Sequence, residues 1–315
     1  MKPPNDSVEL MPAAGSSPVS PARARSDGGL AVVAGLPLPW RGYVAAAVEA
    51  HGWKSLRPFE WDGARLRWPQ RTWQGVVPVS VGELDGRVEV SWPSALAREG
   101  GDEIVRAVRR SFFLDVDFQA FHALCRKHRD TVPIANAGLG PILRSPTAFE
   151  DAVKTLLTTN VTWPLTKRMA QALCERFGGP EAAFPTPERL LAASAAELRA
   201  AGLGYRATYV RELARRVAEG ELDLEALERS KDPRLILRSI RGFGPYAVAH
   251  MAMLLGSFDE IPVDSWALTL ARRYLVRGKR EATKADIERH FRRFGRWRAL
   301  VFRLYRWDRA EARDW

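Results

Sequence analysis

Residues 240–250 read IRGFGPYAVAH, and this spacing of two glycines and a proline predicts a tight hairpin between two helices. Gly242 and Gly244 allow backbone conformations that a side chain would forbid. Pro245 suits the first turn of a helix, because it has no N–H group to leave unsatisfied there. The segment therefore predicts a helix N-terminus with exposed backbone amides, which is a favourable site for a phosphate oxygen.

Residues 261–264 read IPVD and place a carboxylate, Asp264, at the start of a third helix. An aspartate at that position is either an N-cap, which stabilises a helix by about 1 kcal/mol, or a catalytic carboxylate. The two roles are compatible. We expect the helix amides to lower the pKa of Asp264 and to keep it ionised at pH 7.

The charge of the chain favours a polyanionic partner. Its 315 residues carry a formal net charge of +11, and the sequence pI is near 10.1. Lysine and arginine supply most of the non-specific affinity for nucleic acid. No stretch approaches the roughly 20 apolar residues that cross a bilayer. We therefore expect no membrane partner and a cytoplasmic protein, and the lack of a coiled-coil pattern favours a monomer.

Periodicity changes along the chain. Between residues 40 and 92, short aromatic or β-branched runs alternate with Asp-Gly turns, which predicts antiparallel strands at 59–61, 64–68, 75–81 and 87–92. From about residue 97 the pattern is helical. Helices are expected to begin near Asp151, Pro187, Ser194 and Lys284. In residues 283–315 the aromatic residues are expected to face inward and most arginines outward.

The hairpin and Asp264 together resemble the helix-hairpin-helix/GPD superfamily of DNA repair glycosylases. Residues 201–210, AGLGYRATYV, are similar to a GLGYRAxYI segment of its 8-oxoguanine and 3-methyladenine II branches, the two that the chain resembles most. Residues 158–178 are similar to the helix pair that opens the same domain. The resemblance covers residues 135–315 well and 38–134 loosely.

The expected fold class is α+β. Residues 1–36 are rich in Pro, Ser, Ala and Gly and are expected to form a disordered tail. Residues 37–134 are expected to form a small α+β domain with the antiparallel sheet. Residues 135–315 are expected to form an all-α helix-hairpin-helix glycosylase domain.

The resemblance implies a role for each motif, because a glycosylase must flip a nucleotide out of the duplex to reach C1′. It implies Asp264 as the catalytic carboxylate and damaged double-stranded DNA as the partner. The remaining implied residues are Tyr246, Trp163 and Trp266 for the base pocket, and Gly242, Phe243, Gly244, Asn160 and Arg206 for DNA binding.

Tyr246 decides between two kinds of chemistry. Bifunctional relatives carry a lysine at this place, which forms a Schiff base with C1′. A phenol cannot do so, whereas an aromatic ring attracts a cationic N-alkylated purine. We therefore expect a monofunctional glycosylase that hydrolyses the N-glycosidic bond of alkylated, 3-methyladenine-like bases.

Two alternatives stay open. An 8-oxoguanine-type glycosylase/lyase is suggested by the GLGYRA segment and Asn160, and would need another amine such as Lys154 or Lys167. A non-catalytic DNA-binding protein would use the hairpin only as a phosphate clamp. The preferred lesion, the opposite base and the role of the tail are not specified by the sequence.

No metal site is expected. Cys125 and Cys174 are the only cysteines, which is too few for the four-cysteine iron–sulfur loop of some relatives. They are interpreted as buried apolar residues. The resemblance implies at most a monovalent cation, held by the hairpin carbonyls of Arg238, Ile240 and Phe243.

Overall fold

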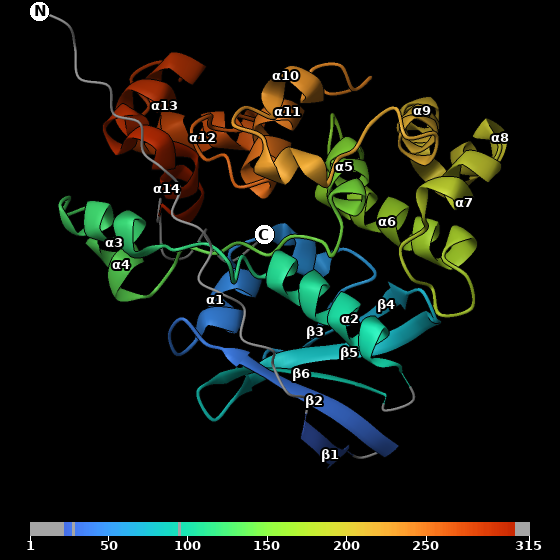
Figure 1. Ribbon diagram of the computed structural model, residues 1–315. Coiled ribbons are helices and arrows are strands. Elements are labelled where there is room, and N and C mark those ends of the chain that lie inside the picture. Colours follow the sequence, from blue (N-terminus) through green and yellow to red (C-terminus); the bar gives the residue numbers. More distant parts are fainter. Residues whose placement is uncertain (1–21, 27–28, 94–95, 306–315) are drawn as a thin grey trace, which may run out of the picture.

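The computed structural model describes residues 22–26, 29–93 and 96–305, with side chains from residue 35 onward. It shows an antiparallel sheet followed by a larger helical region, so the α+β prediction is confirmed (Figure 1). The sheet lies at one end of the molecule, and α1 and α2 lie between it and most of the other helices (Figure 1).

The six strands of the sheet follow the order β1-β2-β6-β5-β4-β3, and every neighbouring pair is antiparallel. Side chains alternate between the two faces, as in β6, where Val88, Val90 and Trp92 are buried. The strands are Ala22–Ser26 (β1), Gly29–Pro37 (β2), Glu60–Trp61 (β3), Leu66–Thr72 (β4), Gly75–Leu84 (β5) and Arg87–Pro93 (β6).

The Asp-Gly signal between β5 and β6 is a two-residue turn, with φ of 49° at Asp85 and 72° at Gly86. Both positive angles match the right-handed twist of a hairpin. The prediction of a structureless tail was wrong in part, because β1 lies within it, β2 begins within it, and β2 pairs with β6. Its low hydrophobic periodicity hid a strand that gains stability from pairing with a distant partner. Residues 1–21 and 27–28 lie outside the described residues.

The helices are α1 (Tyr43–Glu49), η1 (Gly52–Ser55), α2 (Arg98–Ser111), α3 (Gln119–Arg126), α4 (Val132–Asn136), α5 (Ala148–Leu157), α6 (Trp163–Phe177), α7 (Pro187–Ala192), α8 (Ala195–Leu198), η2 (Arg199–Leu203), α9 (Arg206–Ala218), η3 (Ala226–Arg229), α10 (Arg234–Leu237), α11 (Pro245–Leu254), α12 (Ser265–Tyr274), α13 (Lys284–Phe291), η4 (Arg292–Trp297) and α14 (Arg298–Leu304).

Three of the predicted helix starts are confirmed. Pro187 begins α7, Ser194 caps α8 in a capping box, and Lys284 begins α13. The start predicted at Asp151 was wrong, because Thr147 caps α5 and the helix begins at Ala148. Asp151 is instead fully buried within the helix, where it has a tertiary role.

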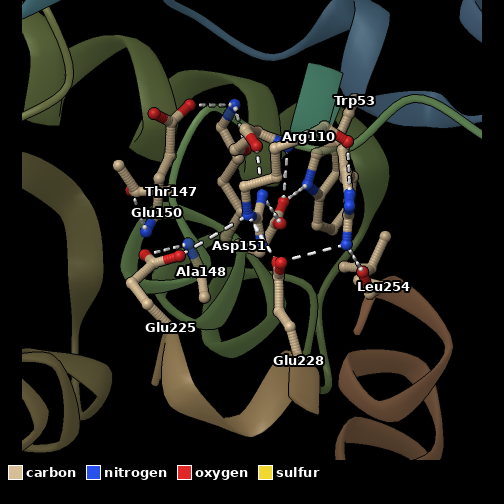
Figure 2. Close-up of polar contacts among 12 residues, drawn as sticks. Trp53, Arg110, Thr147, Ala148, Glu150, Asp151, Glu225, Glu228 and Leu254 are labelled. Carbon is tan, nitrogen blue, oxygen red and sulfur yellow. Dashed lines mark hydrogen bonds and ion pairs between the residues drawn. The ribbon is translucent and has the colours of Figure 1, made fainter. Parts of the chain in front are cut away.

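Asp151 is the centre of a buried polar network that joins η1, α2 and α5 (Figure 2). Its carboxylate accepts hydrogen bonds from the Trp53 indole at 2.7 Å, from the Ser145 amide at 2.8 Å and from Arg110 at 2.9 Å. These donors come from η1, from the loop before α5 and from α2. Because each group is withdrawn from water, the network holds the three segments in one arrangement.

The network continues to the end of the hairpin helix. Glu228 pairs with Arg110 at 2.6 Å and with Arg144 at 3.1 Å. Arg144 then donates to the carbonyl of Leu254 at 2.9 Å, at the C-terminal end of α11. A chain of charge-assisted bonds therefore runs from α2 to the hairpin helix (Figure 2).

An aromatic cluster packs the C-terminal helices against the segment that follows α2. The ring of Trp297 lies 5.4 Å from Phe121, 6.3 Å from Phe118 and 5.5 Å from Phe258, measured between centroids. These contacts cross the domain boundary predicted at residues 134 and 135. In the described part of the chain, no helix is long and apolar enough to span a bilayer.

Lys154 and Glu150 form a second buried pair on α5, with 2.6 Å between Nζ and Oε1. The lysine is completely buried and its ammonium also lies 4.6 Å from the centroid of the Phe59 ring. Burial raises the pKa of Glu150 above its ordinary value, and the charge of the neighbouring Lys154 offsets part of this rise.

We predict that Lys154→Met destabilises the fold by about 3 kcal/mol, because it leaves the Glu150 carboxyl buried without its partner. Adding Glu150→Gln should restore at least half of that loss, since neither group then needs a counter-charge. Urea denaturation of the three proteins measures both effects. A double variant that is less stable than Lys154→Met would contradict this account of the pair.

Candidate active site

The hairpin between α10 and α11 requires a glycine at its first glycine position. Gly242 has a φ of 93°, and a Cβ atom built there would lie 2.6 Å from Tyr209 Cδ2 and 2.9 Å from Leu156 Cδ2. Both backbone conformation and close packing therefore exclude a side chain. Phe243 is 8% exposed, so the DNA contact predicted for it can come only through its backbone.

Gly244 is a glycine for a different reason. It is the N-cap of α11, with φ of −78° and ψ of −178°, which any residue adopts. A Cβ there would meet nothing within 4 Å. No side chain caps the helix, and Gly244 and Pro245 are exposed, so the N-terminus of α11 lies at the surface. The fold itself therefore does not require a glycine at this position.

Asp264 is the N-cap of α12, as predicted, and its Oδ1 accepts the amide of Ala267 at 2.7 Å. The expected lowering of its pKa was wrong in net direction. Burial raises the pKa of Asp264, and this effect outweighs the lowering by the helix amides and by Arg303. The carboxylate is therefore held in a partly dry environment, where its charge acts more strongly than in water.

Tyr246 is the second residue of α11 and stacks on His250 one turn later. The two rings are nearly parallel, at 6°, with centroids 5.6 Å apart. Burial raises the pKa of Tyr246 to about 12, and the nearby charge of Asp264 contributes in the same direction. The phenol is thus neutral at pH 7, its ring is fixed by His250, and it lies within electrostatic range of the candidate catalytic carboxylate.

Behind Tyr246, two buried histidines form a hydrogen-bonded relay that sequence reasoning missed. His51 Nδ1 lies 2.7 Å from the carbonyl of Leu143, so this nitrogen carries the proton. His51 Nε2 is then the acceptor for His250 Nε2, 3.2 Å away. His250 Nδ1 in turn accepts the hydroxyl of Thr155 at 3.3 Å. Burial first, and the charge of Arg303 second, lower the pKa of both histidines, to about 3 for His250.

Arg303 is the other missed residue. Most arginines of residues 283–315 are predicted to face outward, but Arg303 extends inward from α14 and donates from Nε to the carbonyl of Ala50 at 3.0 Å. Its charge lowers the pKa of both Tyr246 and Asp264. The available signal was its position four residues after Ala299, which is fully buried, because this spacing puts both on one helix face.

Trp163, predicted for the base pocket, begins α6 and lies against η1. A Cβ at Gly52 would be 2.9 Å from Trp163 Cη2, so the ring covers the Gly52 backbone. The neighbours of Gly52, His51 and Trp53, have rings 5.3 Å and 5.1 Å from that of His250. Through these contacts Trp163 belongs to the same region as Tyr246. Trp266 is 37% exposed on α12, two residues after Asp264.

Arg206, at the start of α9, is hydrogen-bonded to the loop between α5 and α6 that carries Asn160. Asn160 is exposed with a φ of 48°, and its carbonyl accepts from Arg206 Nη2 at 3.1 Å. The same nitrogen donates to the carbonyl of Thr159. Arg206 is only 5% exposed, so the structure favours its holding this loop over the direct DNA contact predicted for it. Tyr205 beside it is 51% exposed.

Lys154 cannot be the amine that a lyase would need, because it is completely buried and paired with Glu150. Lys167 is exposed on α6. Cys125 and Cys174 are free and buried. Within residues 22–26, 29–93 and 96–305, no three His, Cys, Asp or Glu side chains gather to hold a metal ion.

Comparison with known proteins identifies the family. Residues 153–296 match the model of the HhH-GPD superfamily base excision DNA repair protein, and this range holds the hairpin, Tyr246 and Asp264. Residues 153–296 of the chain belong to the HhH-GPD superfamily. No curated protein sequence matches it.

Two solved structures show that this HhH-GPD protein shares its fold with glycosylases. The 3-methyladenine DNA-glycosylase from Archaeoglobus fulgidus has a TM-score of 0.71 at 20% identity, over 87% of this chain and 98% of that one. The 8-oxoguanine glycosylase/lyase from Clostridium acetobutylicum has a TM-score of 0.63 at 18% identity, over 91% and 98%. At these identities the likeness establishes the fold.

The buried histidines of this HhH-GPD protein generate a prediction about pH. The pKa of His250 is lowered from 6.5 to about 3, so between these values the unfolded chain binds a proton that the folded chain does not. Above pH 6.5, His250 therefore causes no loss of stability. As the pH falls below 6.5, the free energy of unfolding decreases, and His250 accounts for a loss on the order of 2 kcal/mol at pH 5.

His250→Gln should flatten this loss in thermal denaturation between pH 7 and pH 5. His128→Gln, at a partly buried histidine just after the end of α3, is the control and should keep the slope of the unmodified protein. An identical slope in all three proteins would show that His250 does not stay neutral in the folded state.

Proposed function

We propose that this HhH-GPD protein is a monofunctional DNA glycosylase, which hydrolyses the N-glycosidic bond of an alkylated, 3-methyladenine-like base flipped out of double-stranded DNA. The observation that carries the proposal is the pairing of Asp264 with Tyr246. The first supplies a partly buried carboxylate, and the second puts a neutral phenol where a lyase needs an amine.

The residues around Asp264 account for hydrolysis. A carboxylate close to C1′ stabilises oxocarbenium character there, or orients and deprotonates the attacking water. Its N-cap bond to Ala267 fixes the carboxylate, and the charge of Arg303 favours the ionised form against the effect of burial. The glycosidic bond of an N-alkylated purine is already labile, so the single carboxylate suffices.

The residues around Tyr246 account for the choice of base. An N-alkylated purine is cationic, and the face of an aromatic ring attracts a cation by roughly 0.5 to 2 kcal/mol. The ring of Tyr246 is held by its stack on His250, and that histidine is neutral because it is buried. A neutral histidine adds no repulsion against a cationic base. Trp163 and Trp266 are the further aromatic residues of the proposed pocket.

The uncapped N-terminus of α11 supports a DNA phosphate as the anion at Gly244. Asn160, exposed at the tip of its loop, is proposed to fill the gap that the flipped base leaves. The carbonyls of Arg238, Ile240 and Phe243 would hold a monovalent cation. The Ile240 carbonyl already accepts the amide of Phe243 at 3.0 Å, but its second lone pair is still available to a cation.

The first test is release of 3-methyladenine and 7-methylguanine from methylated duplex DNA, followed by chromatography. Asp264→Asn should lower the single-turnover rate by roughly 100-fold or more, because it removes the charge that stabilises C1′. Asp223→Asn is the matched control, since Asp223 is an exposed carboxylate that also accepts a backbone amide, that of Ala226, at 2.9 Å.

The same reactions distinguish the alternatives. Strand breaks should appear only after alkali, and borohydride should trap no protein–DNA adduct. Unchanged base release by Asp264→Asn would overturn the catalytic assignment, and a trapped adduct would favour the glycosylase/lyase. Absence of base release together with tight DNA binding would move the substrate to an oxidised or deaminated base, or favour the non-catalytic alternative.

Arg303 generates a second prediction about activity. Removing its charge by Arg303→Met should raise the pKa of Asp264 further, so the acidic limb of the pH profile of kcat/KM should move to higher pH. Arg303→Lys keeps a positive charge and should restore much of the profile. If both variants lose activity equally at every pH, Arg303 acts through structure alone.

A further inference from the structure

A cleft outside the proposed base pocket lies between η1–β3 on one side and α6 on the other. Its volume is about 600 Å³, within the range of pockets that hold a small molecule or a nucleotide. Its lining includes Lys54, Arg57 and Trp61 on the sheet side and Lys167 and Arg168 on α6. Four cations and an indole therefore surround one hollow.

The cations on the sheet side of the cleft form ion pairs, whereas those on the α6 side form none among the described residues. On the sheet side, Lys54 pairs with Glu49, and Arg57 pairs with Glu60. The indole of Trp61 also donates to Glu49, at 2.7 Å. On α6, neither Lys167 nor Arg168 forms an ion pair within the described part of the chain, and both are exposed. The cleft thus carries two uncompensated positive charges on the α6 wall.

The α6 wall is one continuous helix face. Pro164, Lys167, Arg168 and Gln171 all line the cleft, and spacings of three and four residues place them on the same side of a helix. The two cations are adjacent in sequence and point into the same hollow, which suits a single anionic group with oxygens on more than one side, such as a phosphate.

The position of the cleft relates it to the proposed site. Lys167 is four residues after Trp163, or about 6 Å further along the helix axis. Trp163 itself covers Gly52, and Lys54 of the opposite wall is two residues after Gly52. Both walls of the cleft are therefore continuations of segments that border the base pocket. Asn160 lies three residues before α6 begins, so a duplex held at Asn160 would lie beside the helix that forms this wall.

We propose that this cleft is a second nucleic-acid contact, in which Lys167 and Arg168 hold a backbone phosphate of the DNA that flanks the flipped base. Trp61 forms an apolar wall for the adjoining sugar. This inference rests on the proposed DNA substrate, and it adds a site that the hairpin, the Asn160 loop and the base pocket do not include.

The test is the salt dependence of duplex binding by Lys167→Ala/Arg168→Ala. Loss of one neutralised phosphate should make the slope of log K against log salt less steep by about 1. The matched control is Arg126→Ala/Lys127→Ala, which removes two adjacent exposed cations from the end of α3, at the opposite side of the molecule from α6 (Figure 1). The control should keep the slope.

Base release under saturating enzyme keeps this proposal separate from the proposed function. Normal release with a lowered slope supports both. Normal release with an unchanged slope overturns the cleft assignment and leaves the glycosylase standing. A lowered slope without base release in any form supports the cleft and overturns the glycosylase.

A free nucleotide offers the same phosphate chemistry as DNA, so deoxyadenosine monophosphate is titrated in parallel by calorimetry. Binding that disappears in Lys167→Ala/Arg168→Ala, together with an unchanged salt slope, would reassign the cleft to a free nucleotide and overturn the DNA assignment. Thermal denaturation of both double variants confirms that the exposed substitutions leave the fold intact.

Discussion

The buried carboxylate of Asp151 is the contact on which the arrangement of the molecule depends. It receives Trp53 from the sheet side, Arg110 from α2 and the backbone of Ser145 (Figure 2). Through Glu228 and Arg144 the same network reaches the end of the hairpin helix. Buried charges are costly unless each is paired, so this set holds only in the geometry that satisfies all its members. The sheet region and the hairpin helix are therefore locked at one relative position.

That position creates the candidate site at the contact between η1 and α11, hereafter the seam. His51 and Trp53 come from η1, whereas His250 and Tyr246 come from α11, and the four rings meet only because the seam is closed. Burial at the seam keeps both histidines neutral and raises the pKa of Asp264, which Arg303 partly offsets. One physical cause, loss of water, thus sets the ionisation of the whole site.

Local features of the fold could be read from the sequence because their causes lie within a few residues. Gly242 needs a positive φ, Asp85-Gly86 matches a two-residue hairpin turn, and Ser194 caps a helix with its own neighbours. The errors concern residues whose partners are distant. β2 is a strand because it pairs with β6, and Asp151 is buried because Trp53 and Arg110 reach it.

The sequence by itself determined the order of hairpin, Tyr246 and Asp264, and with it the family and the absence of a lysine where a lyase carries one. Only the tertiary structure decided that Arg303 points inward, that Arg206 holds the Asn160 loop and that the pKa of Asp264 is raised rather than lowered. The reason is that burial and Coulomb interactions depend on distance through space, and residues such as Ala50 and Arg303 become neighbours only when the chain has folded.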